Sequence, residues 1–214
     1  MGIVRLSISM SLDGYVAGPD QGLEQPLGAG GEKLHEWAVA TRTFRALHGG
    51  EGGETGVDDE RAAAILGGVG ATIMGRNMFG PVRGPWAEPA WSGWWGDEPP
   101  YRSPVFVLTH HPRAPLTLGR TTFHFVTDGI EAALERARAA AGDADVSIGG
   151  GAATARQYLR AGLVDEVELH VAPVLLGAGE RLLEDLGDGA RDLEAAGIVS
   201  SPAAAHVRLA RGAA

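Results

Sequence analysis

The sequence contains no cysteine, only one lysine and no long uninterrupted apolar run. The absence of cysteine excludes disulfide scaffolds, CxxC redox motifs, thiolate nucleophiles and cysteine-ligated zinc sites. Charged residues interrupt the apolar runs, and no basic segment at the start leads into a long apolar stretch. We therefore expect neither a secretion signal nor a membrane-spanning helix, and we predict a cytoplasmic protein.

Positive charge is also scarce, because 18 lysine and arginine residues face 27 aspartate and glutamate residues, which gives a net charge of -9. A nucleic-acid-binding surface needs a basic face, and the charge here is spread along the chain. We expect no nucleic-acid partner and no membrane partner. A phosphate-bearing ligand would have to be held by a few local donors against an unfavourable overall charge.

Glycine, in contrast, is abundant, with 33 residues among 214, about twice its usual share of roughly 7%. The acidic, glycine-rich segment 49–56 is too short and too early in the chain to separate two domains. A chain of this length is sufficient for one large domain with its own core. We therefore expect a single domain over residues 1–214.

Hydrophobic periodicity predicts strands that alternate with helices through the middle of the chain. A helix is expected over residues 32–47, a second helix capped by Asp58 or Asp59, and a third begun by a capping box of Asp128 and Glu131. The predicted strands cover 3–10, 71–74, 105–109, 122–126, 146–148 and 166–171, with a hairpin of 193–199 and 203–209. The second of these helices is expected to end at 66, and a fourth helix is expected to cover 152–161. This order predicts a mainly parallel α/β sheet with antiparallel closing strands.

Two of the predicted strands lead directly into glycine, and further candidate binding residues follow these glycines. Gly149, Gly150 and Gly151 follow one strand and precede a helix, so their backbone N–H groups and the helix dipole would form an anion site suited to a pyrophosphate. The alternative is a tight structural turn. Gly75 and Arg76 form the second such end, where the guanidinium would reach a phosphate or else pair with acidic residues. Ligands of open α/β sheets bind at such strand ends.

A third strand end carries Thr109, His110 and Arg113, which together would hold a ribose phosphate or else form an exposed turn. The adjacent residues His110 and His111 face different directions on an extended chain and make a poor metal pair. The segment Glu32-x-x-His35-Glu36 places a carboxylate and an imidazole on one helix face, but a carboxylate-bridged metal site needs a second such motif. We therefore predict no metal site.

Residues 81–104 form a long segment rich in proline and containing Trp86, Trp91, Trp94 and Trp95. It has too many breakers for a regular element, and loops of this length are often functional. The tryptophans would cover a substrate opening, form a subunit contact or pack locally.

Several of these segments, in this order, resemble the dihydrofolate reductase-like superfamily. The resemblance is closest to the reductase domain at the C-terminus of the bifunctional riboflavin-biosynthesis deaminase/reductase and its stand-alone bacterial relatives. The matching segments are SMSLDGYVA at 9–17, IMGRNMF at 73–79, PVFVLT at 104–109, GGGA at 149–152, and AGLVDE at 161–166 continuing to APVLLGAG at 172–179. The resemblance implies a three-layer α/β/α fold with a mixed, mostly parallel central sheet.

The resemblance also implies NADPH as hydride donor for the reduction of a small C=N or C=O substrate, of pterin, pyrimidine or similar type. It places Gly75, Arg76 and Asn77 on one side of the pyrophosphate and Gly149, Gly150, Gly151 and Ala152 on the other. Thr109 and His110, supported by Arg113, would lie at the adenosine ribose and its 2′-phosphate. Val16 and Ala17 would pack beside the nicotinamide. Asp13 would line the substrate side, and Asp13 or ordered water is the candidate proton donor, although on sequence alone the turn interpretation of Asp13 is favoured.

The resemblance does not extend to the acidic residue that dihydrofolate reductases carry on the first helix, because residues 33–37 contain no counterpart in register. Folate reduction is therefore not implied. The main alternative function is a non-catalytic NADP(H)- or nucleotide-binding sensor on the same fold, and a purely structural dimer module is a third. Segments 166–171 and 173–176, together with the resemblance, predict a homodimer.

Overall fold

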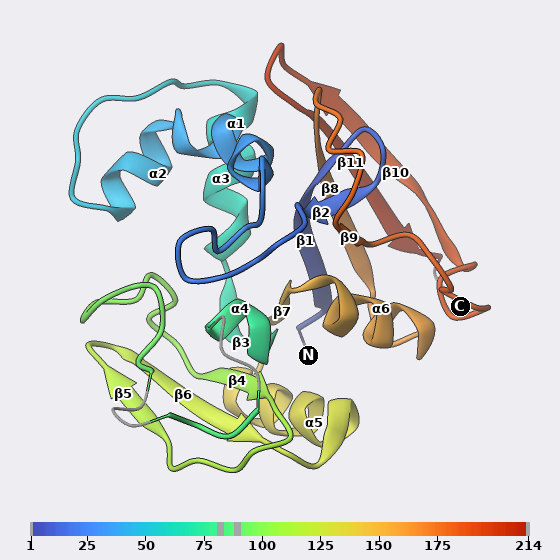
Figure 1. Ribbon diagram of the computed structural model, residues 1–214. Coiled ribbons are helices and arrows are strands. Elements are labelled where there is room, and N and C mark those ends of the chain that lie inside the picture. Colours follow the sequence, from blue (N-terminus) through green and yellow to red (C-terminus); the bar gives the residue numbers. More distant parts are fainter. Residues whose placement is uncertain (1, 81–83, 88–90, 213–214) are drawn as a thin grey trace.

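The computed structural model describes residues 2–80, 84–87 and 91–212. Within them a nine-stranded sheet runs in the order β10-β11-β8-β1-β7-β3-β4-β6-β5, and β2 pairs with β9 (Figure 1). The strands are β1 (Val4–Ser11), β2 (Tyr15–Ala17), β3 (Val69–Gly75), β4 (Val105–Leu108), β5 (Leu116–Leu118), β6 (Thr121–Val126), β7 (Asp145–Gly150), β8 (Glu166–Ala172), β9 (Glu180–Arg181), β10 (Leu193–Ser200) and β11 (Ala205–Arg211). The helices are the 3-10 helix η1 (Gly31–His35), α1 (Glu36–Val39), α2 (Arg42–Leu47), α3 (Val57–Leu66), α4 (Arg76–Phe79), α5 (Gly129–Ala141) and α6 (Ala152–Arg160).

The central strands are parallel. β1 pairs with both β7 and β8, and β3 pairs with β7 and β4, while β4 continues the parallel pairing to β6. β11 and β10 close one side as antiparallel strands, and β5 closes the other. The predicted mixed, mostly parallel α/β sheet and its C-terminal hairpin are confirmed. Because the central strands are parallel, their carboxyl ends all lie along one edge of the sheet.

Helices α5 and α6 cover one face of the sheet, and both lie in the lower part of Figure 1. Ala133 and Ala137 of α5 and Tyr158 of α6 belong to the same buried cluster as Leu6 of β1 and Ile73 of β3. Complete burial of a leucine or isoleucine side chain stabilises the fold by about 1.5–3 kcal/mol. This cluster therefore fixes both helices against the central strands.

The other face is covered in two different ways. On one side it carries η1, which contacts β1 and β8, and α3, which contacts β10. Helices α1 and α2 pack against these two, and α1, α2 and α3 lie together at the upper left of Figure 1. Over β3, β4 and β6 it carries the tryptophan segment, whose Trp86, Trp91 and Trp95 pack against a buried cluster that includes Phe79 and Phe123. Local packing therefore accounts for most of this segment, of which residues 81–83 and 88–90 lie outside the described part.

The expected helix over residues 32–47 is broken into η1, α1 and α2. Thr41 causes the second break, because its backbone is extended and its hydroxyl accepts a hydrogen bond from the Phe44 amide at 3.1 Å. The same hydroxyl donates to the Ala38 carbonyl at 2.7 Å. A threonine that bonds to the backbone on both sides begins a new helix and cannot continue the old one.

One predicted helix cap is wrong. Asp58 and Asp59 lie inside the first turn of α3, after the N-cap residue Gly56, and their carboxylates bond to side chains and backbone of other segments. Asp128 is the N-cap residue of α5, as predicted, but its side chain forms no capping hydrogen bond and its carboxylate pairs with Arg136. In both places the acidic side chain bonds to groups other than the amides of its own helix. The short elements α4, β5 and β9 also had no clear periodicity in the sequence.

None of the helices described is long and apolar enough to cross a membrane.

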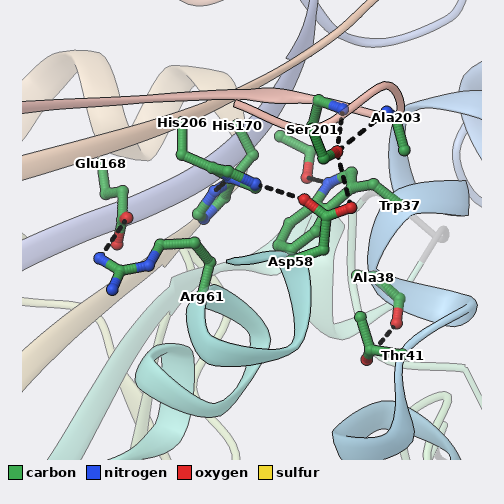
Figure 2. A network of polar contacts seen from close by, with 12 residues as sticks. Trp37, Ala38, Thr41, Asp58, Arg61, Glu168, His170, Ser201, Ala203 and His206 are labelled. Carbon is green, nitrogen blue, oxygen red and sulfur yellow. Dashed lines mark hydrogen bonds and ion pairs between the residues drawn. The ribbon is translucent and has the colours of Figure 1, made fainter. Parts of the chain in front are cut away.

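A buried polar chain joins α3 to the sheet (Figure 2). Asp58 Oδ1 lies 2.8 Å from His206 Nε2, the Nδ1 atoms of His206 and His170 lie 2.7 Å apart, and His170 Nε2 lies 2.8 Å from Ser7 Oγ. Ser201 donates to the other oxygen of Asp58 at 2.7 Å. We call Ser7, His170, His206 and Asp58 the histidine chain.

One set of tautomers satisfies every bond of the histidine chain with both imidazoles neutral. Ser7 donates to His170, His170 Nδ1–H donates to His206, and His206 Nε2–H donates to the Asp58 carboxylate. A single proton lies between the two Nδ1 atoms, and an extra proton on His170 Nε2 would reverse the hydrogen bond with Ser7. Burial first, and then the charges of His206, Arg61 and His35, lower the pKa of His170 to about 3.

We predict that this chain makes the protein less stable in acid. Below about pH 6.5 the unfolded chain protonates His170, whereas the folded protein does so only near pH 3, so the free energy of unfolding falls as pH decreases between these values. Each such group contributes a slope of up to about 1.4 kcal/mol per pH unit. Urea unfolding at several pH values measures this slope. His170→Asn should make the slope of unfolding free energy against pH shallower. Ser201→Ala should lower the free energy of unfolding without changing that slope. An unchanged slope in His170→Asn contradicts the assignment.

Candidate functional site

A cleft of about 900 Å³ runs along the carboxyl ends of the central strands. Residues at or just before these ends line it in the order of the sheet: Ser9 of β1, Gly149 of β7, Gly75 of β3, Leu108 of β4 and Val126 of β6. This volume is near the upper end of the range of roughly 300–1,000 Å³ that is typical of small-molecule sites. The parallel pairing of the sheet therefore creates one continuous cleft with two distinct ends.

The glycine turn after β7 lies at the middle of this cleft. Gly149 and Gly151 line it, Gly151 is the N-cap of α6, and the peptide bond between Gly150 and Gly151 is cis. Ala152 and Thr154 of the first turn of α6 line the cleft as well. The first amides of a helix have no partner within the helix and carry its positive dipole end, so this turn presents anion-binding donors.

The next strand of the sheet is packed tightly against the same helix start. A Cβ atom at Gly75 would lie 2.3 Å from Thr154 Oγ1 and 3.7 Å from the Gly150 carbonyl oxygen. At Gly151, in contrast, a Cβ atom would meet nothing within 4 Å. Glycine at 75 is therefore required by packing, whereas glycine at 151 keeps open space.

Arg76 follows Gly75 and supplies a positive charge to the middle of the cleft. Its guanidinium carbon lies 3.3 Å from the centre of the Trp86 ring, and Nη1 is 3.4 Å from Thr109 Oγ1. Nε is buried and has no hydrogen-bond partner among the described residues. Burial, and then the charge of Arg113, lower the pKa of Arg76. The side chain nevertheless remains cationic, because arginine has a very high ordinary pKa.

Arg113 does not line the cleft, and its neighbours differ from the ribose-phosphate site expected for it. It donates to the Trp91 carbonyl, and its guanidinium carbon lies 4.9 Å from the Trp86 ring centre and 5.0 Å from that of Phe125. Trp86 therefore contacts both Arg76 and Arg113. The second arginine adds positive charge near the cleft and orders the tryptophan segment, but it is placed to support rather than to contact a ligand there.

The strand end after β4 contributes Thr109 and His110, which both line the cleft as expected. Thr109 is buried, and its hydroxyl accepts from the His111 amide at 3.1 Å. Trp94 and Trp95 line this part of the cleft together with these residues. The tryptophan segment therefore forms part of the wall as well as the packing behind it.

The opposite end of the cleft is formed by β1 and β2. Val16 and Ala17 are buried and line it, together with Ser9, His35 and Glu180. Glu180 reaches this end because β9 pairs with β2, with Ala17 opposite Glu180.

Asp13 has a structural role in this fold. Its carboxylate accepts hydrogen bonds from the amides of Leu176, at 3.1 Å, and Gly177, at 2.7 Å. A hydrogen bond with Ser11 and these backbone bonds lower the pKa of Asp13 to about 2, so the group is ionised at neutral pH. It does not line the cleft. The turn interpretation therefore fits Asp13, whereas the expected role of Asp13 as proton donor does not.

The structure thus brings most of the predicted site residues together. Those that line the cleft are Val16, Ala17, Gly75, Arg76, Asn77, Thr109, His110, Gly149, Gly151 and Ala152. Asp13, Arg113 and Gly150 do not line it, and Gly150 instead pairs with Met74 of β3 at a positive φ of 106°. Among the described residues no three potential metal ligands gather at one point.

Several residues that line the cleft were not predicted from the sequence. Thr154 and Gln157 of α6 line the cleft from the helix that follows the glycine turn, and their place one helical turn apart was a usable signal. His35 was visible only as a member of a helix face. Glu180 had no local signal, because a pairing between distant short strands brings it to the cleft.

The family model of the RibD C-terminal domain matches residues 3–207. The chain belongs to the RibD C-terminal domain family. None of the curated proteins that were compared matches the sequence.

Solved structures similar to this RibD C-terminal domain show the same fold. A riboflavin biosynthesis protein from Shewanella sp. PV-4 has a TM-score of 0.61 at 21% identity, with 99% of each chain covered. A deaminase/reductase from Thermotoga maritima has a TM-score of 0.54 at 12% identity, over 99% of this chain and 57% of that chain. A dihydrofolate reductase from Enterococcus faecalis, complexed with NADP(H), has a TM-score of 0.52 at 12% identity, over 99% and 98%. The dihydrofolate reductase-like fold is therefore confirmed.

We predict that Gly75→Ala destabilises the protein by about 1–3 kcal/mol, because its Cβ atom overlaps Thr154 Oγ1. Urea unfolding measures this loss. Thr154→Ala removes the overlapping atom, so the double variant should lose less stability than the two single losses combined. Simple additivity contradicts a direct clash between these two positions.

Proposed function

We propose that this protein is a reductase that uses NADPH to reduce a small C=N or C=O substrate, with residues 1–214 acting as one domain. The observation that carries the proposal is the joint presence of the glycine turn, the α6 N-terminus and Arg76 at the middle of one strand-end cleft. Family membership supports a reductase in general.

The residues present fit a dinucleotide. A pyrophosphate needs backbone donors, positive charge and room for close approach, and Gly151 leaves space where a Cβ atom would otherwise stand. Arg76 has a buried Nε without a hydrogen-bond partner among the described residues, and it brings positive charge to the same cleft. Arginine suits phosphate better than a point charge does, because its planar group can bind two oxygens.

The remaining residues divide the cleft between the two halves of the dinucleotide. Thr109 and His110 would lie at the adenosine ribose and its 2′-phosphate. Val16 and Ala17 would pack beside the nicotinamide at the β1 end. When bound, NADPH supplies the hydride, and the protein positions the reacting atoms and excludes water. Asp13 is placed to hold the 176–177 loop during this reaction, because both of its oxygens accept backbone hydrogen bonds.

Binding without catalysis is the alternative function on the same fold. It predicts that NADPH binds but that no pterin, quinone or imine is reduced. Turnover of any one of these compounds rejects it.

We predict that NADPH quenches tryptophan fluorescence on binding and that Gly151→Ala weakens this binding about tenfold or more, which corresponds to about 1.4 kcal/mol. The added methyl group would occupy the space proposed for the pyrophosphate. Because this space is empty of protein atoms, the melting temperature should not change.

Gly212→Ala is the control, since a Cβ atom there also meets nothing within 4 Å and the residue lies outside the cleft. It should bind NADPH like the wild type. Failure of the wild type to bind NADPH or NADH at millimolar concentration would falsify the reductase proposal.

We also propose a homodimer, through a different strand from the one expected. β8 cannot offer an edge, because it pairs with β1 on one side and β11 on the other. β10 is the outer strand of the sheet, and Ile198 and Val199 on it are 69% and 44% exposed. An open edge strand with apolar side chains is a template for pairing, and antiparallel pairing with a second copy has twofold symmetry.

Light scattering at micromolar concentration should therefore show a dimer. Ile198→Lys should give a monomer, because it places a charge on the proposed contact strand. Leu23→Lys, at an exposed apolar residue that lies outside β10, is the control and should leave the dimer intact. A monomeric wild-type protein rejects the homodimer.

A further inference from the structure

The β1 end of the cleft holds two titratable side chains that the proposed cofactor contacts do not use. His35 follows the buried Leu34 at the end of η1, and Glu180 lies on β9. Both line the cleft beside Ser9 and Ala17. No hydrogen bond of the His35 ring is found with any described residue, and Glu180 forms no ion pair among them. Two polar side chains without hydrogen-bond or ion-pair partners in the described part of the chain therefore line the same cleft.

We propose that His35 and Glu180 form the substrate subsite and select a phosphate-free heterocycle that carries an N–H group beside a carbonyl or imine. This inference rests on the proposed reductase function, because it places the substrate next to the nicotinamide. The imidazole contacts the carbonyl or imine, and the carboxylate accepts from the N–H group.

His35 is held in place by a rigid surrounding. Leu34 is completely buried, and Trp37 is 2% exposed and donates from its indole N–H to Ser9 Oγ at 3.0 Å. The Trp37 ring lies 4.5 Å from His170 and 4.9 Å from His206, so the histidine chain packs directly behind it (Figure 2). A ligand group on such a support loses little conformational entropy on binding.

Charge at this end of the cleft excludes a phosphate. Apart from the histidines, Arg76 is the one basic residue among the described residues that line the cleft. It follows β3, which lies two strands away from β1 in the sheet. Glu180, which pairs with Ala17 of β2, contributes negative charge at this end of the cleft. A phosphate group here would meet a carboxylate and no arginine or lysine of the described wall, which disfavours binding.

Burial lowers the pKa of His35, so the ring is mostly neutral at pH 7 and both donates and accepts hydrogen bonds. Other titratable groups on or against η1 are Glu32, Lys33, Glu36 of α1, Tyr15 of β2, Arg5 of β1, and Glu166, Glu168 and His170 of β8. His170 is the member of this set whose own pKa responds to His35. A neutral imidazole suits an uncharged heterocycle.

The test is an NMR titration of the full chain with labelled histidine, using uridine and uridine 5′-monophosphate as probes that differ only in the phosphate. The His35 resonance is identified by its absence in His35→Gln. Uridine should shift this resonance, and the monophosphate should bind about tenfold more weakly, a difference of about 1.4 kcal/mol. Glu180→Gln should reduce the difference in affinity between uridine and the monophosphate, because it removes the negative charge of the carboxylate.

His35→Gln should weaken uridine binding while leaving NADPH affinity and the melting temperature unchanged. The exposed His48, the C-cap residue of α2, does not line the cleft; it is the internal control and should not respond. Each titration is run with and without NADP+, so that failure of NADP+ to bind rejects the reductase function separately. An unresponsive His35 resonance, or tighter binding of the monophosphate, overturns the subsite.

Discussion

Parallel pairing of β1, β7, β3, β4 and β6 is the constraint on which the rest of the structure depends. It places five carboxyl ends along one edge of the sheet, and these ends become the floor of a single cleft. The glycine turn after β7 then leads directly into α6, whose unpaired amides face that cleft. Without parallel register, the glycines and Arg76 would lie at opposite ends of the sheet.

The two faces of the sheet support the two ends of the cleft differently. Behind the β1 end, the histidine chain and Trp37 hold η1 and α3 against β1 and β8 by buried hydrogen bonds. Behind the β4 and β6 end, Phe79, Trp86 and Arg113 pack as an aromatic cluster with a cation over it. The first support responds to protonation, whereas the second consists mainly of apolar contacts and a charge that arginine keeps at all ordinary pH values.

The sequence was informative where function depends on local order along the chain. Gly75, Arg76, Gly149 and Gly151 could be assigned to the cleft because a strand followed by glycine and a helix has few alternative arrangements. Asp13, Arg113 and Glu180 could not be placed in the same way, since loop contacts, aromatic stacking and the β2–β9 pairing decide their positions. The break at Thr41 was missed because apolar spacing continued through it.

We propose that the middle of the cleft binds the pyrophosphate of NADPH, and a crystal structure of the protein with NADP+ tests this proposal. We expect pyrophosphate oxygens within hydrogen-bond distance of the first α6 amides and the Arg76 guanidinium, with the nicotinamide beside Val16 and Ala17. A dinucleotide bound elsewhere on the molecule, or bound in the cleft without contact to α6 or Arg76, would contradict it.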